Sequence, residues 1–147
     1  MRQSIQVLVL PYKHENKKIK YAIFRREDLD VWQGIAGGVE EGETYLEAGR
    51  REANEEASIP LDREYILLDS KSTIPVNFIQ GNFLWGKDVY NAIEYCFGVC
   101  VDDVELIISD EHQEYKWVDY EEAFKLFKWD SNRNALWELN ERIKRME

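Results

Sequence analysis

Residues 37–59, GGVEEGETYLEAGRREANEEASI, contain the most distinctive pattern of the chain. A pair of glycines opens the segment and Gly42 precedes a helix-like run; glycines let a backbone adopt positive φ and approach a ligand closely. Between Glu40 and Glu56 there are seven glutamates and two arginines, a net charge of −5 out of −10 for the whole chain. Composition alone allows two interpretations of this run, a solvated helix face and a cation site.

Residues 44–57 have the pattern of a helix. Thr44 suits the N-cap position, Glu47 three residues later completes a capping box, and no proline follows until Pro60. On a helix with 100° per residue, three carboxylates fall within an arc of roughly 100°, while small residues line another side. These carboxylates are Glu52, Glu55 and Glu56. Like charges at such spacings destabilise a helix, and a hard divalent cation such as Mg²⁺, which prefers oxygen ligands, would remove the conflict.

The rest of the chain alternates strand-like and helix-like patterns. β-branched and aromatic residues predict strands over 4–11, 19–26, 35–39, 65–75, 90–101 and 115–118. The polar stretch 12–18 predicts the turn of a hairpin, and 121–127 and 134–145 predict closing helices. Because no repeat or linker interrupts the 147 residues, we expect one α/β domain, 1–147, with a mixed sheet covered by helices.

Composition excludes several classes of protein. The chain is 44% apolar and 13% aromatic, which is typical of a globular domain, and its net charge of −10 argues against nucleic acid as a partner. No apolar run reaches the ~20 residues of a membrane span, and the N-terminus has no cleavage pattern of a secretory signal. We therefore expect no membrane partner and a cytoplasmic location. Cys96 and Cys100 share one face of a predicted strand and are expected to be reduced thiols.

The segment 37–59 resembles the Nudix box, G-x5-E-x7-R-E-U-x-E-E-x-G-U, in which U is an aliphatic residue. The matching positions are Gly37, Glu43, Arg51, Glu52, Glu55, Glu56 and Ile59. Two positions depart from the pattern: Ala53 is small for an aliphatic place, and Ser58 stands where the family has glycine. Since glycine relieves a left-handed helix cap, serine there should cost about 1 kcal/mol of stability if that conformation is kept.

This resemblance implies a Nudix-fold α/β/α sandwich with a mixed β-sheet, and a hydrolase that uses Mg²⁺, or Mn²⁺ in its place. It makes Glu52, Glu55 and Glu56 candidate metal ligands. It also pairs Arg51 with Glu43, which holds the helix edge in register. A carboxylate must accept a proton from the attacking water; both Glu55 and Glu111 are candidates, and Glu111 is a further candidate metal ligand.

Shorter segments outside the box are similar to the bacterial dihydroneopterin triphosphate pyrophosphohydrolases, a Nudix subgroup also noted for acting on dATP-like nucleotides. They lie at 25–27, 31–33, 42–44, 110–112, 115–117 and 131–133. The resemblance implies substrate contacts by Arg2, Arg25, Ala36, Gly37, Gly38, and Ser131 or Asn132. The subgroup's threonine before the glycine pair is Ala36 here, which weakens the substrate assignment.

Several other side chains have both a functional and a structural interpretation. The ring of Trp32 could stack on a flat heterocycle or form the edge of the core. His112 adjoins Glu111 and is a weaker candidate for the base. We expect Trp117 and Trp129 in the core, His14 at the surface, and Glu40 and Glu41 solvated.

We therefore expect an enzyme that hydrolyses a nucleoside-triphosphate-like substrate, pterin or purine, to the monophosphate and pyrophosphate. Alternatives are a hydrolase of another diphosphate, such as ADP-ribose or a dinucleotide, a Nudix fold kept as a ligand-binding module, and an acidic scaffold. The intact carboxylate cluster argues against a pure binding module. The expected partner is a small nucleotide or pterin triphosphate, and the expected state is a monomer or a homodimer.

Overall fold

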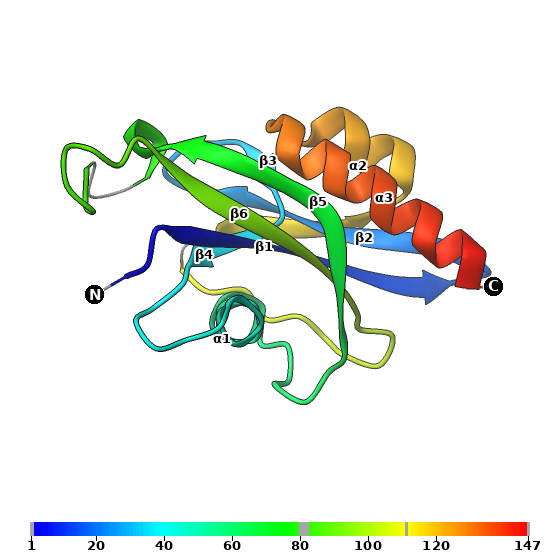
Figure 1. The fold of residues 1–147 in the computed structure, drawn as a ribbon. Coiled ribbons are helices and arrows are strands. Elements are labelled where there is room, and N and C mark those ends of the chain that lie inside the picture. Colours follow the sequence, from blue (N-terminus) through cyan, green and yellow to red (C-terminus); the bar gives the residue numbers. More distant parts are fainter. Residues whose placement is uncertain (1, 80–82, 111, 147) are drawn as a thin grey trace.

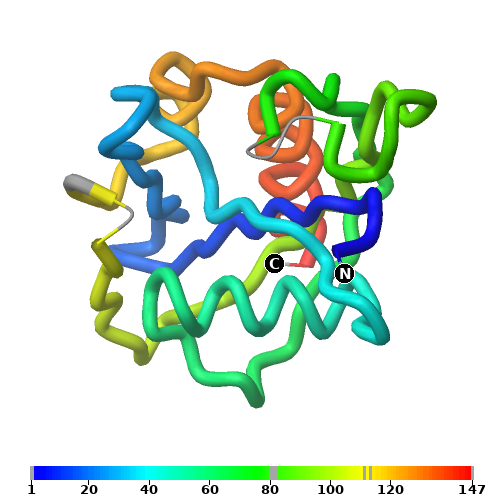
Figure 2. Tube along the Cα trace, turned by 90° about the vertical axis from the view of Figure 1, so that its left-hand side faces the viewer, coloured from blue at the N-terminus to red at the C-terminus, as the bar shows by residue number. Residues whose placement is uncertain are grey.

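The fold is a mixed β-sheet between helices, as the sequence predicts (Figure 1). The computed structural model describes residues 2–79, 83–110 and 112–146. Helix α1 (Tyr45–Ala57) covers one face of the sheet, and α2 (Tyr120–Leu126) and α3 (Asp130–Met146) cover the other; Figure 2 shows the same layers from the side. The strands are β1 (Ile5–Glu15), β2 (Lys18–Arg26), β3 (Trp32–Gln33), β4 (Ile35–Gly38), β5 (Tyr65–Pro75), β6 (Asn91–Cys100) and β7 (His112–Val118), and a 3₁₀ turn, η1 (Val76–Phe78), follows β5.

Strand β1 is the centre of the sheet. The sheet order is β3-β2-β1-β6-β5, with β4 paired to β1 and β7 paired to β2. β1 runs parallel to β6 and antiparallel to both β2 and β4. Because β4 pairs with the first half of β1 and β2 with the second half, two different elements share one side of the same strand.

The core has two layers because side chains alternate across the strands. Val7, Val9 and Phe97 face α1, whereas Leu8 and Leu10 face α2 and α3. Gly49 lets α1 lie close to the sheet: a Cβ at this position would sit 3.5 Å from the Phe97 ring and 3.6 Å from Val9, which is ordinary contact. The predicted small-residue side of the helix is therefore its sheet-facing side.

The predicted hairpin turn at 12–18 is wrong in extent. β1 continues to Glu15, Tyr12 is buried opposite Tyr21, and the turn consists of Asn16 and Lys17. These two residues have φ of 52° and 66°. A two-residue turn with positive φ at both positions matches the twist of paired strands, so the polar residues before it stay in the ladder.

Three other boundaries differ from the sequence prediction. β7 begins at His112 rather than 115, and Trp32–Gln33, predicted as loop, pairs with β2. α3 begins at Asp130 rather than 134, where the Asp130 carboxylate pairs with Arg133 in the first turn and favours the helix N-terminus.

The aromatic and cysteine predictions have mixed outcomes. Trp117 and Trp129, expected in the core, are half-buried at its margin; the Trp129 indole N–H donates to Gln33 Oε1 at 2.9 Å. Cys96 and Cys100 lie on one face of β6, as predicted; this face is the α3 side of the sheet, and both are free thiols.

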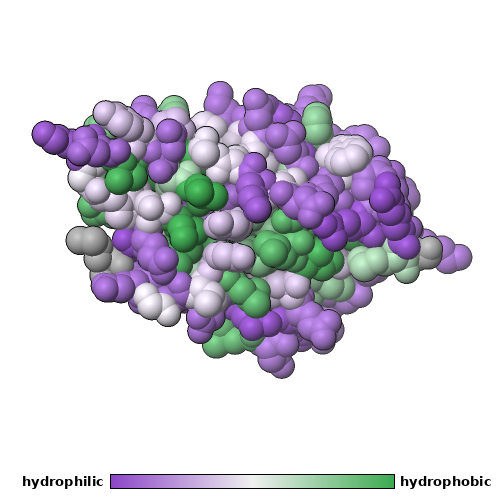
Figure 3. Space-filling model, in the orientation of Figure 1, coloured by the Kyte–Doolittle hydropathy of each residue, from purple (hydrophilic) through white to green (hydrophobic). Residues whose placement is uncertain are grey.

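The face seen in Figure 3, which β5 crosses, is mainly hydrophilic, with hydrophobic side chains gathered across its middle. Leu67 of β5 is among the exposed hydrophobic residues. Within the described ranges, no helix is both long and apolar enough to cross a membrane.

Candidate active site

Arg51 organises the first half of the site. Its guanidinium donates to both carboxylate oxygens of Glu43, at 2.8 and 3.0 Å, and to the carbonyl oxygen of Gly38 at 2.9 Å. Hydrogen bonding to Arg51 holds the pKa of Glu43 below its usual range. The expected Arg51–Glu43 pair is thus present, and it fastens the glycine loop to α1.

Glu52 lies directly beneath β4. Its carboxylate accepts from Arg51 at 2.9 Å, and a side chain at Gly37 would overlap it, which explains a glycine at this position. Burial raises the pKa of Glu52, although hydrogen bonds with Glu56 and Arg51 oppose that rise. The site therefore holds a poorly hydrated carboxylate against a second one, an arrangement that a cation would stabilise.

Glu56 is buried against His112. The His112 ring Nε2 lies 3.0 Å from Glu56 Oε1, and these side chains are only 1% and 6% exposed. The Phe24 ring packs 5.2 Å from the imidazole, and Ser109 N–H donates to the Glu56 carbonyl at 3.0 Å. The sequence favours the neighbouring Glu111 over His112 as the base. The contact of His112 with Glu56 spans 56 residues, and no local sequence pattern reports it.

Glu55 is the accessible carboxylate of α1. Its side chain is 57% exposed, and Arg51 Nη1 is 3.4 Å from it. Glu111, the other candidate base, lies outside the described residues. Glu40 and Glu41 are exposed, as expected for solvated residues.

Arg2 lies on the opposite face of β4 from Glu52. A side chain at Gly38 would overlap its guanidinium. In the amide orientation that satisfies both neighbours, Gln6 accepts from Arg2 Nη2 at 2.6 Å and donates to the Gly37 carbonyl at 3.1 Å. Consecutive glycines of β4 therefore admit a carboxylate on one face and a guanidinium on the other.

The other predicted substrate residues have structural partners. Arg25 donates to Asp30 and pairs with Glu114, both at 2.8 Å, and so contacts these two carboxylates rather than the box. Trp32 is half-buried, with Lys116 Nζ 5.0 Å from its ring centroid.

The start of α3 is tied to the connection between β3 and β4. Asn132 is buried; its side-chain oxygen accepts from Gly34 N–H at 2.8 Å, and its amide nitrogen donates to Ser131 Oγ at 3.2 Å. Ala36 is half-buried on β4 opposite Leu8. Ser131, like Ala36, is half-buried, whereas Asn132 is buried.

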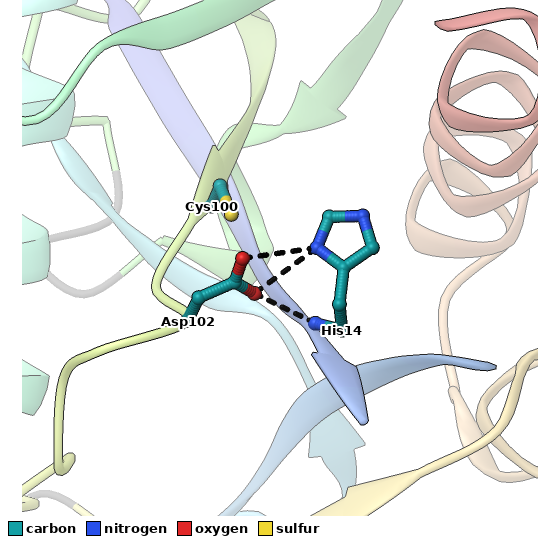
Figure 4. A group of neighbouring side chains, drawn as sticks. All are labelled: His14, Cys100 and Asp102. Carbon is teal, nitrogen blue, oxygen red and sulfur yellow. Dashed lines mark hydrogen bonds and ion pairs between the residues drawn. The ribbon is translucent and has the colours of Figure 1, made fainter. Parts of the chain in front are cut away.

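A second group of potential metal ligands lies at the far ends of β1 and β6 (Figure 4). The ligand atoms of His14, Cys100 and Asp102 lie within 4.8 Å of one another. The Asp102 carboxylate accepts from the His14 backbone N–H at 2.7 Å and lies 3.1 Å from its ring Nδ1. His14 is exposed, as predicted.

The donor set of α1 fits a hard divalent cation. Glu52, Glu55 and Glu56 offer only oxygen atoms, which Mg²⁺ and Mn²⁺ accept, and two of the three are poorly hydrated. A diphosphate ligand could supply further oxygen atoms at the open side, where Glu55 is exposed.

Comparison with known proteins agrees with this geometry. The NUDIX domain model matches residues 5–138. Dihydroneopterin triphosphate diphosphatase of Escherichia coli K12 is 33% identical over 137 residues, which cover 92% of this chain and 91% of that protein. A crystal structure described as a NUDIX hydrolase, from Listeria monocytogenes, superposes with a TM-score of 0.88 at 38% identity, covering 98% and 97% of the two chains. Rat asymmetrical bis(5'-nucleosyl)-tetraphosphatase is 28% identical over 127 residues, covering 86% of this chain and 82% of the rat protein.

Proposed function

Because the chain belongs to the Nudix hydrolase family, we propose that it hydrolyses dihydroneopterin triphosphate, or a dATP-like nucleotide, to the monophosphate and pyrophosphate with Mg²⁺. One observation supports the metal-dependent chemistry: Glu52 and Glu56 form a poorly hydrated carboxylate pair, in which Glu52 contacts Arg51 and Glu56 contacts His112. The 33% identity to the E. coli dihydroneopterin triphosphate enzyme supports the substrate class.

The carboxylates and the arginine have distinct roles in this proposal. Glu52 and Glu56, with Glu55, would hold the metal. When bound, Mg²⁺ neutralises charge on the diphosphate and makes a water more nucleophilic. Arg51, held by Glu43, is a positioning residue that keeps Glu52 in place.

The general base is Glu55 or Glu111. Glu55 is exposed and weakly held, so it can reach a water beside the substrate. The candidacy of Glu111 rests on the resemblance to the family, because this residue lies outside the described ranges. Replacing each glutamate by glutamine separates the candidates: the variant without the base should lose kcat and the acidic limb of its pH profile, whereas the other should change mainly the Mg²⁺ requirement.

The proposed substrate contacts lie on the β4 edge and the start of α3. Arg2 would bind phosphate beside Gly37 and Gly38, and Ser131 would contact the substrate. The roles of Arg25, Trp32, Ala36 and Asn132 stay predictions. Arg25 would have to release Asp30 or Glu114 to bind a phosphate.

The test is a product assay with Mg²⁺ on a panel of dihydroneopterin triphosphate, dATP, dGTP, ADP-ribose and diadenosine tetraphosphate. Pyrophosphate release, fastest from the pterin or a deoxynucleotide, is expected. No turnover of any compound, combined with tight binding of one, would instead favour a ligand-binding module. Light scattering of the same sample would distinguish the predicted monomer from the predicted homodimer.

The similarity to the rat bis(5'-nucleosyl)-tetraphosphatase supports a second candidate, a dinucleoside polyphosphate hydrolase. The two candidates differ in products. Diadenosine tetraphosphate split to ATP and AMP, without pyrophosphate from any triphosphate, would favour the second.

A further inference from the structure

Glu94 of β6 is a buried carboxylate that the proposed chemistry does not use. Only 4% of the residue is exposed, and Ser72 Oγ donates to it at 3.2 Å. Burial raises the pKa of Glu94, while hydrogen bonds from Ser72 and Ser131 lower it. Among the described residues, no lysine, arginine or histidine forms an ion pair with it. A buried carboxylate without a cation is unfavourable, and such groups are concentrated at functional sites.

Glu94 belongs to a polar row that crosses the sheet on the α3 side. The strand register places Gly38, Gln6, Glu94 and Ser72 side by side on β4, β1, β6 and β5. Two residues further along the strands the same face is apolar, with Leu8 and Cys96 in the core. The polar row is therefore a local feature of this face and not its general character.

The row leads to the candidate metal site. At one end Arg2 lies over Gly38 and bonds to Gln6, and the adjacent Gly37 meets Glu52 on the other face of β4. Neighbouring strands are about 4.8 Å apart, so Glu94 lies on the order of 10 Å from Gly38, two strands away. A substrate with its phosphates at the β4 edge would need its heterocycle to extend along this row to reach Glu94.

An aromatic pair borders the same region. Phe78, which follows Ser72 through η1, packs 5.9 Å from the Trp129 ring, and Trp129 directly precedes the start of α3 that contains Ser131. Phe78 is mostly exposed, so part of its ring is available to a flat ligand.

The chemistry of a carboxylate selects one type of heterocycle edge. An ionised carboxylate only accepts hydrogen bonds and has about four acceptor sites; the two serine hydroxyls occupy two of them. Two neighbouring N–H groups can occupy both oxygens in the bidentate way that guanidinium groups do. A 2-amino-4-oxo ring, as in pterins and guanine, has such an edge, with a ring N–H beside an amino group. Adenine has an acceptor nitrogen beside its amino group and would face the carboxylate with a lone pair.

We propose that Glu94 is a specificity-determining residue that binds the 2-amino-4-oxo edge of the substrate heterocycle. Gln6 and Ser72, its neighbours in the polar row, would hold that row in place. The inference rests on the proposed function because it narrows the substrate class of that same site. It favours dihydroneopterin triphosphate and guanine nucleotides over dATP.

The test measures binding, so that it does not depend on turnover. Isothermal titration calorimetry with the α,β-imido analogues of dGTP, dITP and dATP, in the presence of Mg²⁺, compares three heterocycle edges. These edges differ in one or two hydrogen-bond donors. For the wild-type protein, Kd should rise about tenfold or more from dGTP to dITP, which lacks the amino group, and again to dATP. Glu94→Gln should bring the three Kd values within about threefold of one another. Glu64→Gln, which changes an exposed glutamate just before β5, is the matched control and should keep the wild-type order.

Two outcomes overturn the proposal: equal wild-type affinity for the three analogues, or an unchanged order in a Glu94→Gln protein that is folded by circular dichroism. If the wild-type protein binds the three analogues in the expected order and Glu94→Gln removes that order, the proposal is supported even when no triphosphate is hydrolysed. Binding without hydrolysis would contradict the proposed reaction but not the proposed recognition site.

Discussion

The acidic edge of α1 and the His14–Cys100–Asp102 cluster both gather residue types that bind metals, but they differ in how their charges are matched. At α1, Glu52 and Glu56 lie together in a poorly hydrated place, and Arg51 divides its donors among several acceptors. At the far end of β1, the Asp102 carboxylate accepts a backbone N–H and faces the His14 ring.

The two regions are also far apart along β1. Gly37, above Glu52, pairs with Val7, whereas His14 lies seven residues further along β1, about 23 Å at the usual strand rise. Ligand types alone therefore do not indicate a cation site. What distinguishes α1 is that three poorly exposed glutamates, Glu43, Glu52 and Glu56, crowd around one arginine and one histidine.

The strongest test of the comparison is Glu56→Gln. It removes a carboxylate from the crowded pair and should lower kcat by about 10³-fold, equivalent to roughly 4 kcal/mol of transition-state stabilisation. The measurement is steady-state hydrolysis over a range of Mg²⁺ concentrations. Glu64→Gln serves as the control. Wild-type activity of Glu56→Gln at every Mg²⁺ concentration, low and high, would contradict the assignment of Glu56 as a metal ligand.

His112→Asn probes the residue behind that carboxylate. The imidazole orients Glu56 from a buried position, so its loss should weaken Mn²⁺ or Mg²⁺ binding by about 10–100-fold, as replacing outer-shell partners of metal ligands does. Metal titration followed by calorimetry checks this. A variant that is destabilised yet binds metal with wild-type affinity would limit His112 to a role in packing.

Asp102→Asn tests the matched cluster and should change stability rather than metal dependence. Partial burial alone would raise the pKa of Asp102, but hydrogen bonds from the His14 backbone and ring and from Cys100 lower it. A lowered pKa in the folded state adds stability above the unfolded pKa, and this stability is lost as pH falls through the folded pKa.

We therefore expect Asp102→Asn to lower the free energy of unfolding by about 1 kcal/mol at pH 7, a modest value because the site is exposed. Urea denaturation should show the difference from wild type shrinking under acid conditions. Magnesium-dependent hydrolysis should stay at the wild-type rate; a loss of metal dependence would mean that the two regions are not separate.

The smallest expected effect is at the end of α1. Ser58 has the left-handed conformation that the sequence predicts, with φ of 60°, and its hydroxyl donates to the Ile107 carbonyl at 3.2 Å. Ser58→Gly relieves the backbone but loses that hydrogen bond, so it should stabilise the protein by about 0.5 kcal/mol. Thermal denaturation measures this, and a lower Tm than wild type would show that the hydrogen bond outweighs the strain.

Local signals explain what could be predicted from sequence. The capping box of Thr44 and Glu47 is present, and α1 runs from Tyr45 to Ala57 as expected because the residues that start and stop it are its neighbours in sequence. The β5 prediction, 65–75, is likewise correct. The Arg51–Glu43 pair, which the resemblance to the Nudix box implies, is also present.

The features that sequence reasoning missed depend on distant partners. His112 is buried by Glu56 and Phe24, and Glu94 by strands on both sides, so neither has a neighbouring residue that reports its environment. The extension of β1 to Glu15 was missed for a similar reason, since its polar residues pair with β2 and contact the region of Asp102.

The parallel pairing of β1 with β6 also sets an order of events during synthesis. It joins residues 5–12 to 93–100, so the central pair of the sheet waits for about two-thirds of the chain, and such long-range pairing is slow. The β1–β2 hairpin and α1 can begin to form on their own, but the Phe97 ring against which Gly49 packs arrives only with β6. A nascent chain that stops before residue 90 therefore contains every residue of the box and lacks the surface that holds them in place.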